Sequence, residues 1–242
     1  MSTTSQVLLL IPVAYLLGSV PFGLMVGKAK GVDPRTAGSG NIGATNVGRL
    51  LGRKFFAIVF LLDMLKGLLP MLAAAGLLRR AGDPQSFGPG TYALWFAVGM
   101  AAIVGHMFSV FLGFKGGKGV ATSAGVVLGL FPYFTVPGAV ALAVWFVVFK
   151  LKRYVSLASM VAAVAFPVLY VIVGLWRGWP VFGGQWPLLA FAVLVAVMIV
   201  YKHRSNIARL RAGTESRYEP GSPAGAADAS PPRPPADAPS AV

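Results

Sequence analysis

Two glycine-rich segments of this chain carry the residue types that bind phosphate groups. Residues 38–49 read GSGNIGATNVGR, and residues 113–122 read GFKGGKGVAT. Glycines let the backbone turn so that successive N–H groups converge on an anion, while Ser, Asn, Lys and Arg supply further donors. In the second segment an apolar helix begins after the glycines, and its amino-terminal N–H groups would face a bound phosphate. The candidate phosphate-binding residues are Gly38, Gly40, Asn41, Asn46, Lys115, Gly116, Gly117, Lys118, Gly119 and Thr122.

Neither segment matches a standard motif for ester hydrolysis or nucleotide binding. Ser39 lacks the glycines of a nucleophile elbow, because Ala37 and Asn41 occupy those positions, so Ser39 is interpreted as a hydrogen-bond donor. The second segment is not a Walker A loop, since Gly119 replaces the Ser or Thr that would bind Mg²⁺. A flexible linker is the alternative for the first segment, although linkers rarely interleave Asn, Arg and apolar residues in this way. A basic turn at anionic lipid headgroups is the alternative for the second segment, and it explains the lysines but not the glycines.

A third polar segment, residues 202–215, follows the last apolar stretch and reads KHRSNIARLRAGTE. His203, Asn206 and Leu210 recur at spacings of three and four, so they share one face of a helix. A basic helix beside the membrane is the plainer alternative. The presence of His, Asn and Glu215 on the same predicted side as the other two segments favours a functional site.

Two charged residues fall inside one apolar stretch, and a histidine lies near the end of another. Asp63 and Lys66 are three residues apart and therefore lie on one helix face. Each alone would cost a few kcal/mol in the membrane, so they pair with one another or face a polar cavity. A structural ion pair and direct substrate contact both fit. His106 precedes the second segment, where it is expected to cap or bridge helices and can orient that segment.

The composition places these residues in a membrane protein. Of 242 residues, 56% are hydrophobic and 12% are charged, about half the charge of a soluble domain. The net charge of +14 beside apolar stretches favours lipids and phosphorylated substrates as partners over nucleic acid. With no cysteine and two histidines, disulfides, thiol nucleophiles, iron–sulfur clusters and multi-ligand His or Cys zinc sites are excluded. We expect no metal and no cofactor.

The hydropathy pattern predicts an all-α protein with seven transmembrane helices. The apolar stretches are residues 6–27, 55–78, 91–112, 119–131, 135–149, 155–176 and 187–201. Most approach the twenty or so residues that a bilayer requires, whereas 119–131 is short and fits a half-span or a tilted helix. Seventeen basic residues fall on one side and three on the other, which predicts an outside amino terminus and a cytoplasmic carboxyl terminus. Residues 1–215 would form the membrane domain, and the Pro- and Ala-rich residues 216–242 a disordered cytoplasmic tail.

Five segments, taken in order, carry a more specific signal. They read GSVPFG (18–23), GSGNIGATNVGR (38–49), DMLKG (63–67), GHMFSVFLGFKGGKGVAT (105–122) and HRSNIARLRAGTE (203–215). Together they resemble the PlsY family, the bacterial integral-membrane acyl-phosphate:glycerol-3-phosphate acyltransferases. The resemblance implies transfer of a fatty acyl group from acyl phosphate to the 1-hydroxyl of sn-glycerol 3-phosphate. The products would be lysophosphatidic acid and phosphate, formed on the cytoplasmic side of the bacterial inner membrane.

The resemblance also implies roles for individual residues. It gives catalytic roles to Ser39, Arg49, His203 and Asn206. It gives glycerol-phosphate binding to residues 116–119 and a role in the integrity of the protein to Glu215. The implied partners are sn-glycerol 3-phosphate, acyl phosphate and membrane lipids, with the protein acting as a monomer. The tail after residue 216 departs from the short end that is usual in the family, and we assign it no catalytic role.

We expect direct acyl transfer without an acyl-enzyme, since an acyl phosphate is already activated and needs positioning more than a strong nucleophile. Arg49, Lys118 and the loop amides would neutralise the phosphates, while Ser39 and either Asn41 or Asn46 would hold the reacting groups. The base is His203 or a phosphate of the substrate. A transporter for phosphate esters or organic anions is the alternative function, although no internal repeat is visible. A lipid-binding scaffold would explain only the positive face.

Overall fold

The predicted spans fold into helices in the computed structural model, which describes residues 1–80, 82–83 and 87–218. The α-helices of this described part are α1 (Thr3–Ser19), α2 (Phe22–Ala29), α3 (Ala44–Leu51), α4 (Arg53–Arg79), α5 (Pro89–Met107), α6 (Val120–Gly129), α7 (Thr135–Lys152), α8 (Val155–Trp176), α9 (Trp186–Lys202) and α10 (Arg204–Arg211). The described residues contain no strand. The predicted all-α membrane fold is therefore confirmed. Residues 219–242 of the predicted tail lie outside the described residues.

Within the described part of the chain, five helical segments are long and apolar enough to cross a bilayer, namely α1 with α2, α4, α5, α7 and α8. The helices α9 and α10 form a sixth candidate when taken together, with a bend of 56° between them. Because α10 carries three arginines in eight residues, we treat α9 as the apolar part and α10 as lying outside it. Helix α6 has 10 residues, a length of about 15 Å against the roughly 30 Å of a bilayer core. Seven crossings and an outside amino terminus stay predictions.

The predicted first span is interrupted rather than continuous. Helix α1 ends at Ser19 and α2 begins at Phe22, with Pro21 between them. Proline lacks an N–H and disfavours a helical conformation at the residue before it, so Pro21 fits the end of α1, although α1 itself continues through Pro12. At this break the carbonyl oxygen of Val20 accepts a hydrogen bond of 2.8 Å from Lys66 Nζ. The interruption thus supplies a polar partner for a charge on α4.

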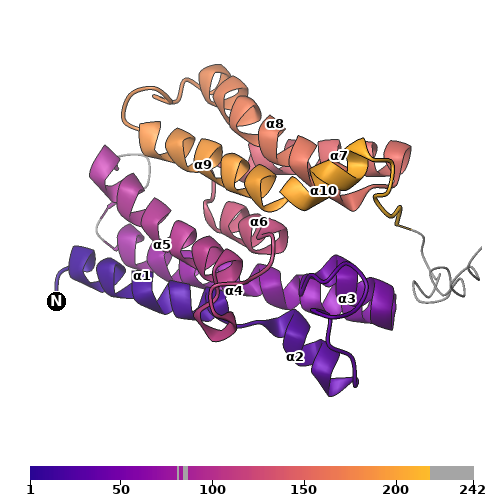
Figure 1. The fold of residues 1–242 in the computed structure, drawn as a ribbon. Helices are drawn as coiled ribbons and strands as arrows, with labels where there is room; N and C mark the ends of the chain where they lie inside the picture. Colours follow the sequence, from indigo (N-terminus) through magenta and orange to yellow (C-terminus); the bar gives the residue numbers. More distant parts are fainter. Residues whose placement is uncertain (81, 84–86, 219–242) are drawn as a thin grey trace, which may run out of the picture.

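The helices form two groups, with the short α6 between them (Figure 1). One group contains α1, α4 and α5 with the shorter α2 and α3, and the other contains α7, α8, α9 and α10. Aromatic rings join the groups on the side where α5 and α9 begin. Phe191 of α9 packs against Phe96 of α5 and against Phe134, with ring centroids 5.4 and 5.9 Å apart. Helices α3 and α10 and the end of α7 lie at the opposite side, next to the polar segments (Figure 1).

Candidate active site

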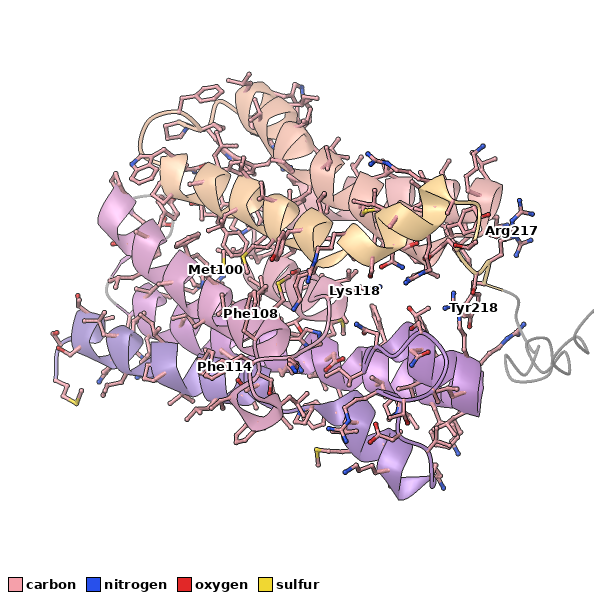
Figure 2. The ribbon with its side chains drawn as sticks, viewed as in Figure 1. Met100, Phe108, Phe114, Lys118, Arg217 and Tyr218 are labelled. Carbon is pink, nitrogen blue, oxygen red and sulfur yellow. The ribbon has the colours of Figure 1, made fainter. Side chains whose placement is uncertain are left out.

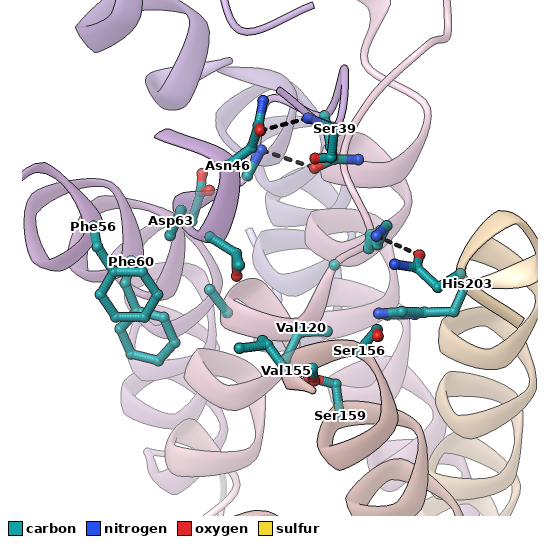
Figure 3. Close-up of a pocket in the computed structure, with 18 of the residues that line it drawn as sticks. Ser39, Asn46, Phe56, Phe60, Asp63, Val120, Val155, Ser156, Ser159 and His203 are labelled. Atoms are coloured by element: carbon teal, nitrogen blue, oxygen red, sulfur yellow. Dashed lines mark hydrogen bonds between the residues drawn. The ribbon is translucent and has the colours of Figure 1, made fainter. Parts of the chain in front are cut away.

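Residues of all three polar segments line one cavity of about 350 Å³ (Figure 3). Its polar lining includes Ser39, Asn41, Asn46, Arg49, Asp63, His106, Lys118, Ser156, His203, Asn206 and Glu215. In Figure 2, Lys118 lies in the space between the two groups of helices. Lys118 and Asn206 are 88 positions apart in the sequence and are hydrogen-bonded to one another. The fold therefore assembles the segments that the sequence singles out separately.

Asn46 organises the first glycine-rich segment from within. Its Nδ2 donates hydrogen bonds to the carbonyl oxygens of Pro34 and Ala37, and its Oδ1 accepts one from the N–H of Ser39. Gly38 has φ +60°, and a Cβ there would lie 2.4 Å from Asn46 Oδ1. The side chain of Asn46, 2% exposed, is thus occupied by the loop itself. Asn46 is therefore interpreted as the residue that shapes the loop presenting Ser39, in place of the predicted role as a phosphate ligand.

The first segment ends in α3, which begins at the cavity. Ala44 and Thr45, at the amino end of α3, line the cavity together with Arg49. The first N–H groups of a helix have no intrahelical acceptor and attract anions. Arg49 Nη2 donates a hydrogen bond of 3.0 Å to the carbonyl oxygen of Ser216. Burial lowers the pKa of this guanidinium, which nevertheless remains charged at neutral pH.

The second segment differs from the predicted cradle of glycine amides. The N–H of Gly116 donates to Met107 O at 3.2 Å, and the N–H of Gly117 donates to His106 O at 3.0 Å. Neither glycine lines the cavity, whereas Gly119, with φ +80°, lines it together with the first residues of α6. The amino terminus of α6 therefore faces the cavity, and the preceding glycines allow the chain to lie against α5.

Lys118 is the cation of this segment that enters the cavity. Its Nζ donates a hydrogen bond of 2.5 Å to Asn206 Oδ1, and Asn206 Nδ2 donates one of 2.6 Å to Glu215 Oε1. Burial lowers the pKa of Lys118 from 10.5 to about 8; Glu215 opposes this shift, and the charges of Arg209 and Arg49 add to it. Cations that repel one another in a partly buried site are stabilised by a bound anion.

Glu215 joins helices α8 and α10 at the edge of the cavity. Its Oε1 also accepts a hydrogen bond of 2.6 Å from Ser156 Oγ of α8, and its Oε2 accepts one of 2.7 Å from Arg209 Nε of α10. Burial alone would raise the pKa of Glu215, but these hydrogen bonds outweigh it and lower the pKa. The carboxylate therefore stays ionised and holds Asn206 in place.

His203 presents one ring nitrogen to the cavity. Its Nδ1 lies 2.8 Å from the carbonyl oxygen of Ile199, an acceptor, so Nδ1 carries the proton and Nε2 is left as an acceptor. Figure 3 shows the ring directed into the cavity. Burial lowers the pKa of His203 to about 4, with the charge of Lys118 adding to the shift. The imidazole is neutral at physiological pH.

Several residues predicted from the sequence lie outside the cavity. Lys115 is exposed on the surface, and Gly38 and Gly40 belong to the loop behind Ser39. Thr122 is fully buried against α4, where its carbonyl oxygen is 2.2 Å from the position of a Cβ on Gly67. Thr122 thus belongs to the contact between α4 and α6 rather than to the lining.

An apolar wall completes the cavity and has no motif in the sequence. It consists of Phe56, Phe60, Ala121, Ala124, Leu142, Trp145 and Val155, from α4, α6, α7 and α8. Phe56 and Phe60 are stacked with ring centroids 5.9 Å apart and lie across the cavity from His203 (Figure 3). Ser156 and Ser159 of α8 were also missed; their only signal is two hydroxyls at the start of an apolar stretch. Among the described residues, no group of three or more His, Asp or Glu could hold a metal ion.

The fold and the cavity define an integral membrane protein whose pocket joins an anion-attracting end to an apolar wall. The chain belongs to the glycerol-3-phosphate acyltransferase family, whose model matches residues 8–213. This is the PlsY family, so the resemblance drawn from the motifs is confirmed.

Relatives of known family cover nearly the whole membrane domain. The glycerol-3-phosphate acyltransferase of Aquifex aeolicus is 46% identical over 217 residues, which are 88% of this chain and 100% of the relative. That of Geobacter metallireducens is 47% identical over 213 residues, 88% of this chain and 97% of the relative. Two crystal structures of PlsY, an integral membrane glycerol 3-phosphate acyltransferase, are 42% identical and cover 88% of this chain and 96% of their own. Their glycerol 3-phosphate and lysophosphatidic acid forms superpose with TM-scores of 0.75 and 0.73.

Proposed function

We propose that this chain transfers a fatty acyl group from an acyl phosphate to the 1-hydroxyl of sn-glycerol 3-phosphate. The products are lysophosphatidic acid and inorganic phosphate. One observation carries the proposal: the same cavity joins two helix amino termini, Arg49 and Lys118 to an apolar wall on α4, α7 and α8. Both substrates are phosphorylated and one carries an acyl chain, so both ends of the cavity are needed.

The two phosphates fit the two sides of the polar end. On one side lie Ser39 and the amino terminus of α3, and on the other lie Lys118 and the amino terminus of α6, with Arg49 at the rim. The glycerol phosphate is assigned to Lys118 and α6, because Asn206 and His203 stand beside Lys118 and fit a hydroxyl-bearing ligand. The acyl phosphate is assigned to Ser39 and α3, with its chain against Phe56 and Phe60.

The reaction proceeds in one displacement in this proposal. The glycerol oxygen attacks the acyl carbonyl carbon, the bond between that carbon and the phosphate oxygen breaks, and phosphate leaves. The hydroxyl proton passes to His203 Nε2 or to a phosphate oxygen of a substrate. With a pKa of about 4, His203 is a weak base in the free enzyme, and a phosphate dianion bound beside it would raise that pKa. Both acceptors therefore stay open, and no acyl-enzyme is needed.

The basic asymmetry of the connections supports a position of this cavity on the cytoplasmic side of the bacterial inner membrane. The acyl chain would then reach the bilayer between α4 and α7.

The test uses the purified protein in detergent and measures phosphate release from palmitoyl phosphate. No metal and no coenzyme A are added. Release that requires sn-glycerol 3-phosphate and matches lysophosphatidic acid formation supports the proposal, with glycerol as the unphosphorylated control acceptor. Lys118→Ala should lower kcat/KM far more than Lys115→Ala, which removes the same charge from the same segment outside the cavity. A folded protein that releases no phosphate, yet moves phosphate esters across vesicles, would support the transporter instead.

A further inference from the structure

A buried polar cluster lies beneath the second glycine-rich segment and has no part in the reaction as proposed. Asp63 and Lys66 of α4 and His106 of α5 are 3%, 2% and 5% exposed. Lys66 Nζ lies 2.7 Å from Asp63 Oδ1, and His106 Nδ1 lies 3.7 Å from the same oxygen. Asp63 and His106 also line the cavity. Ionisable groups inside a membrane domain are costly, so their presence next to a cavity indicates a functional task.

The ring of His106 is the surface against which Gly117 packs. A Cβ on Gly117 would lie 2.3 Å from His106 Nε2 and 2.9 Å from its Cε1. The N–H of Gly117 also donates a hydrogen bond of 3.0 Å to the carbonyl oxygen of His106. Gly117 is thus held by both the side chain and the backbone of one residue. The next residue is Lys118, whose Nζ reaches Asn206 in the cavity.

The position of the His106 ring is fixed by charged side chains of the neighbouring helices α4 and α9. Asp63 faces it from α4, and Lys66 fixes Asp63 while donating a hydrogen bond to Val20 O at the break between α1 and α2. On the other side, Lys202 Nζ of α9 donates a hydrogen bond of 2.7 Å to the carbonyl oxygen of Met107. The end of α5 is therefore fixed from α4 and from α9, and a well-packed ring there transmits its position to Gly117.

We propose that His106, held by Asp63 and Lys66, is a positioning residue for Lys118. Its ring sets how closely the backbone at Gly117 approaches α5. This distance decides where the ammonium of Lys118 meets the phosphate of the acceptor. The inference rests on the proposed function. Loss of the ring displaces Lys118 without removing it, so KM for sn-glycerol 3-phosphate rises, while KM for the acyl phosphate on the α3 side is unaffected.

A double-mutant cycle between His106 and Gly117 tests this contact. Gly117→Ala pushes a methyl group into the ring and raises KM for sn-glycerol 3-phosphate. His106→Ala also raises it, because the support is lost. In the double variant the methyl group occupies the space left by the ring. Its KM is therefore lower than that of Gly117→Ala by on the order of tenfold, within the range of coupling seen between residues in contact.

The matched control is Gly116→Ala. A Cβ at Gly116 would lie 2.0 Å from the carbonyl oxygen of His106. That oxygen belongs to the backbone and is still present in His106→Ala. The side-chain truncation therefore rescues Gly117→Ala and does not rescue Gly116→Ala. Thermal unfolding in detergent is measured for every variant so that folded protein is compared with folded protein.

Three results would overturn the inference. In the first, the rise in KM of the double variant equals the product of the rises in the two single variants. In the second, His106→Ala rescues Gly116→Ala as well as it rescues Gly117→Ala. The third is a His106→Ala protein that is less stable but has an unchanged KM, since a merely structural role moves only stability. If His106→Ala does not fold, His106→Asn removes the ring and keeps a hydrogen-bonding group toward Asp63. A wild-type protein without acceptor-dependent phosphate release would instead overturn the proposed function.

Discussion

Lys118 makes the affinity for the acceptor phosphate depend on pH in a way that the structure predicts. Burial holds the pKa of this lysine at about 8 in the unliganded protein, against 10.5 for an ordinary lysine. Below that pH the ammonium is charged and attracts the phosphate, and above it the free enzyme loses the charge. An anion binds the charged form more tightly, so affinity for sn-glycerol 3-phosphate falls as pH rises through about 8.

The size of the effect follows from linkage. If the bound phosphate restores the ordinary pKa of 10.5, the affinity falls by about tenfold between pH 7 and pH 9, which is about 1.4 kcal/mol of binding free energy. At a pH equal to the free pKa, binding takes up about half a proton. The phosphate itself does not titrate here, since its second pKa is about 6.

Isothermal titration of sn-glycerol 3-phosphate in two buffers of different ionisation enthalpy measures both quantities. The control is Lys118→Arg, because a guanidinium stays charged throughout this range and abolishes the pH dependence even if its geometry weakens binding. An affinity of the wild-type protein that does not change between about pH 7 and about 9 would refute the reasoning, as would the same slope in Lys118→Arg.

Three further predictions concern stability and protonation. Glu215→Ala lowers the free energy of unfolding by about 3 kcal/mol, since Ser156, Asn206 and Arg209 lose their common carboxylate; thermal unfolding should show a smaller loss for Glu215→Gln. Asp63→Asn leaves the ammonium of Lys66 buried without a counter-charge and costs a similar amount. Adding Lys66→Met should recover most of that loss, and a double variant as unstable as Asp63→Asn would contradict the ion pair. His203 is expected to remain the neutral Nδ1–H form until it titrates near a pKa of about 4, because burial disfavours the imidazolium. With two histidines in the chain, imidazole nitrogen NMR can test this directly, and a midpoint at the ordinary 6.5 would speak against it.

The helices and the membrane class could be predicted from local pattern. The stretch 155–176 coincides with α8, and 55–78 differs from α4 by one or two residues at each end. A long apolar segment in a bilayer must satisfy its own backbone hydrogen bonds, so it has little choice other than a helix. The hydropathy pattern predicts one continuous first stretch, whereas the helix passes through Pro12 and is broken at Pro21, because hydropathy carries no information on which proline interrupts a helix.

The candidate site could be predicted only at the level of residue types. The three polar segments, Ser39, Arg49, Lys118, His203 and Asn206 follow from composition, spacing and the family resemblance, and all of these residues line the cavity. The spacing did not show that the N–H groups of Gly116 and Gly117 already bond to α5. Nor did it show that the folded chain continues past residue 215, where Ser216 O accepts a hydrogen bond from Arg49 and the ring of Tyr218 packs 6.3 Å from that of Phe56.

The sequence by itself therefore determined the membrane class, the family and most of the helical elements, because hydropathy and the residues within each motif are local properties of the chain. Only the tertiary structure decided which atoms share a cavity. Lys118 meets Asn206 across 88 positions and Arg49 meets Ser216 across 167. The apolar wall and the contact between His106 and Gly117 depend in the same way on how α4, α5, α6, α7 and α8 pack. Packing is set by the shapes of many side chains at once, and no local pattern contains that information.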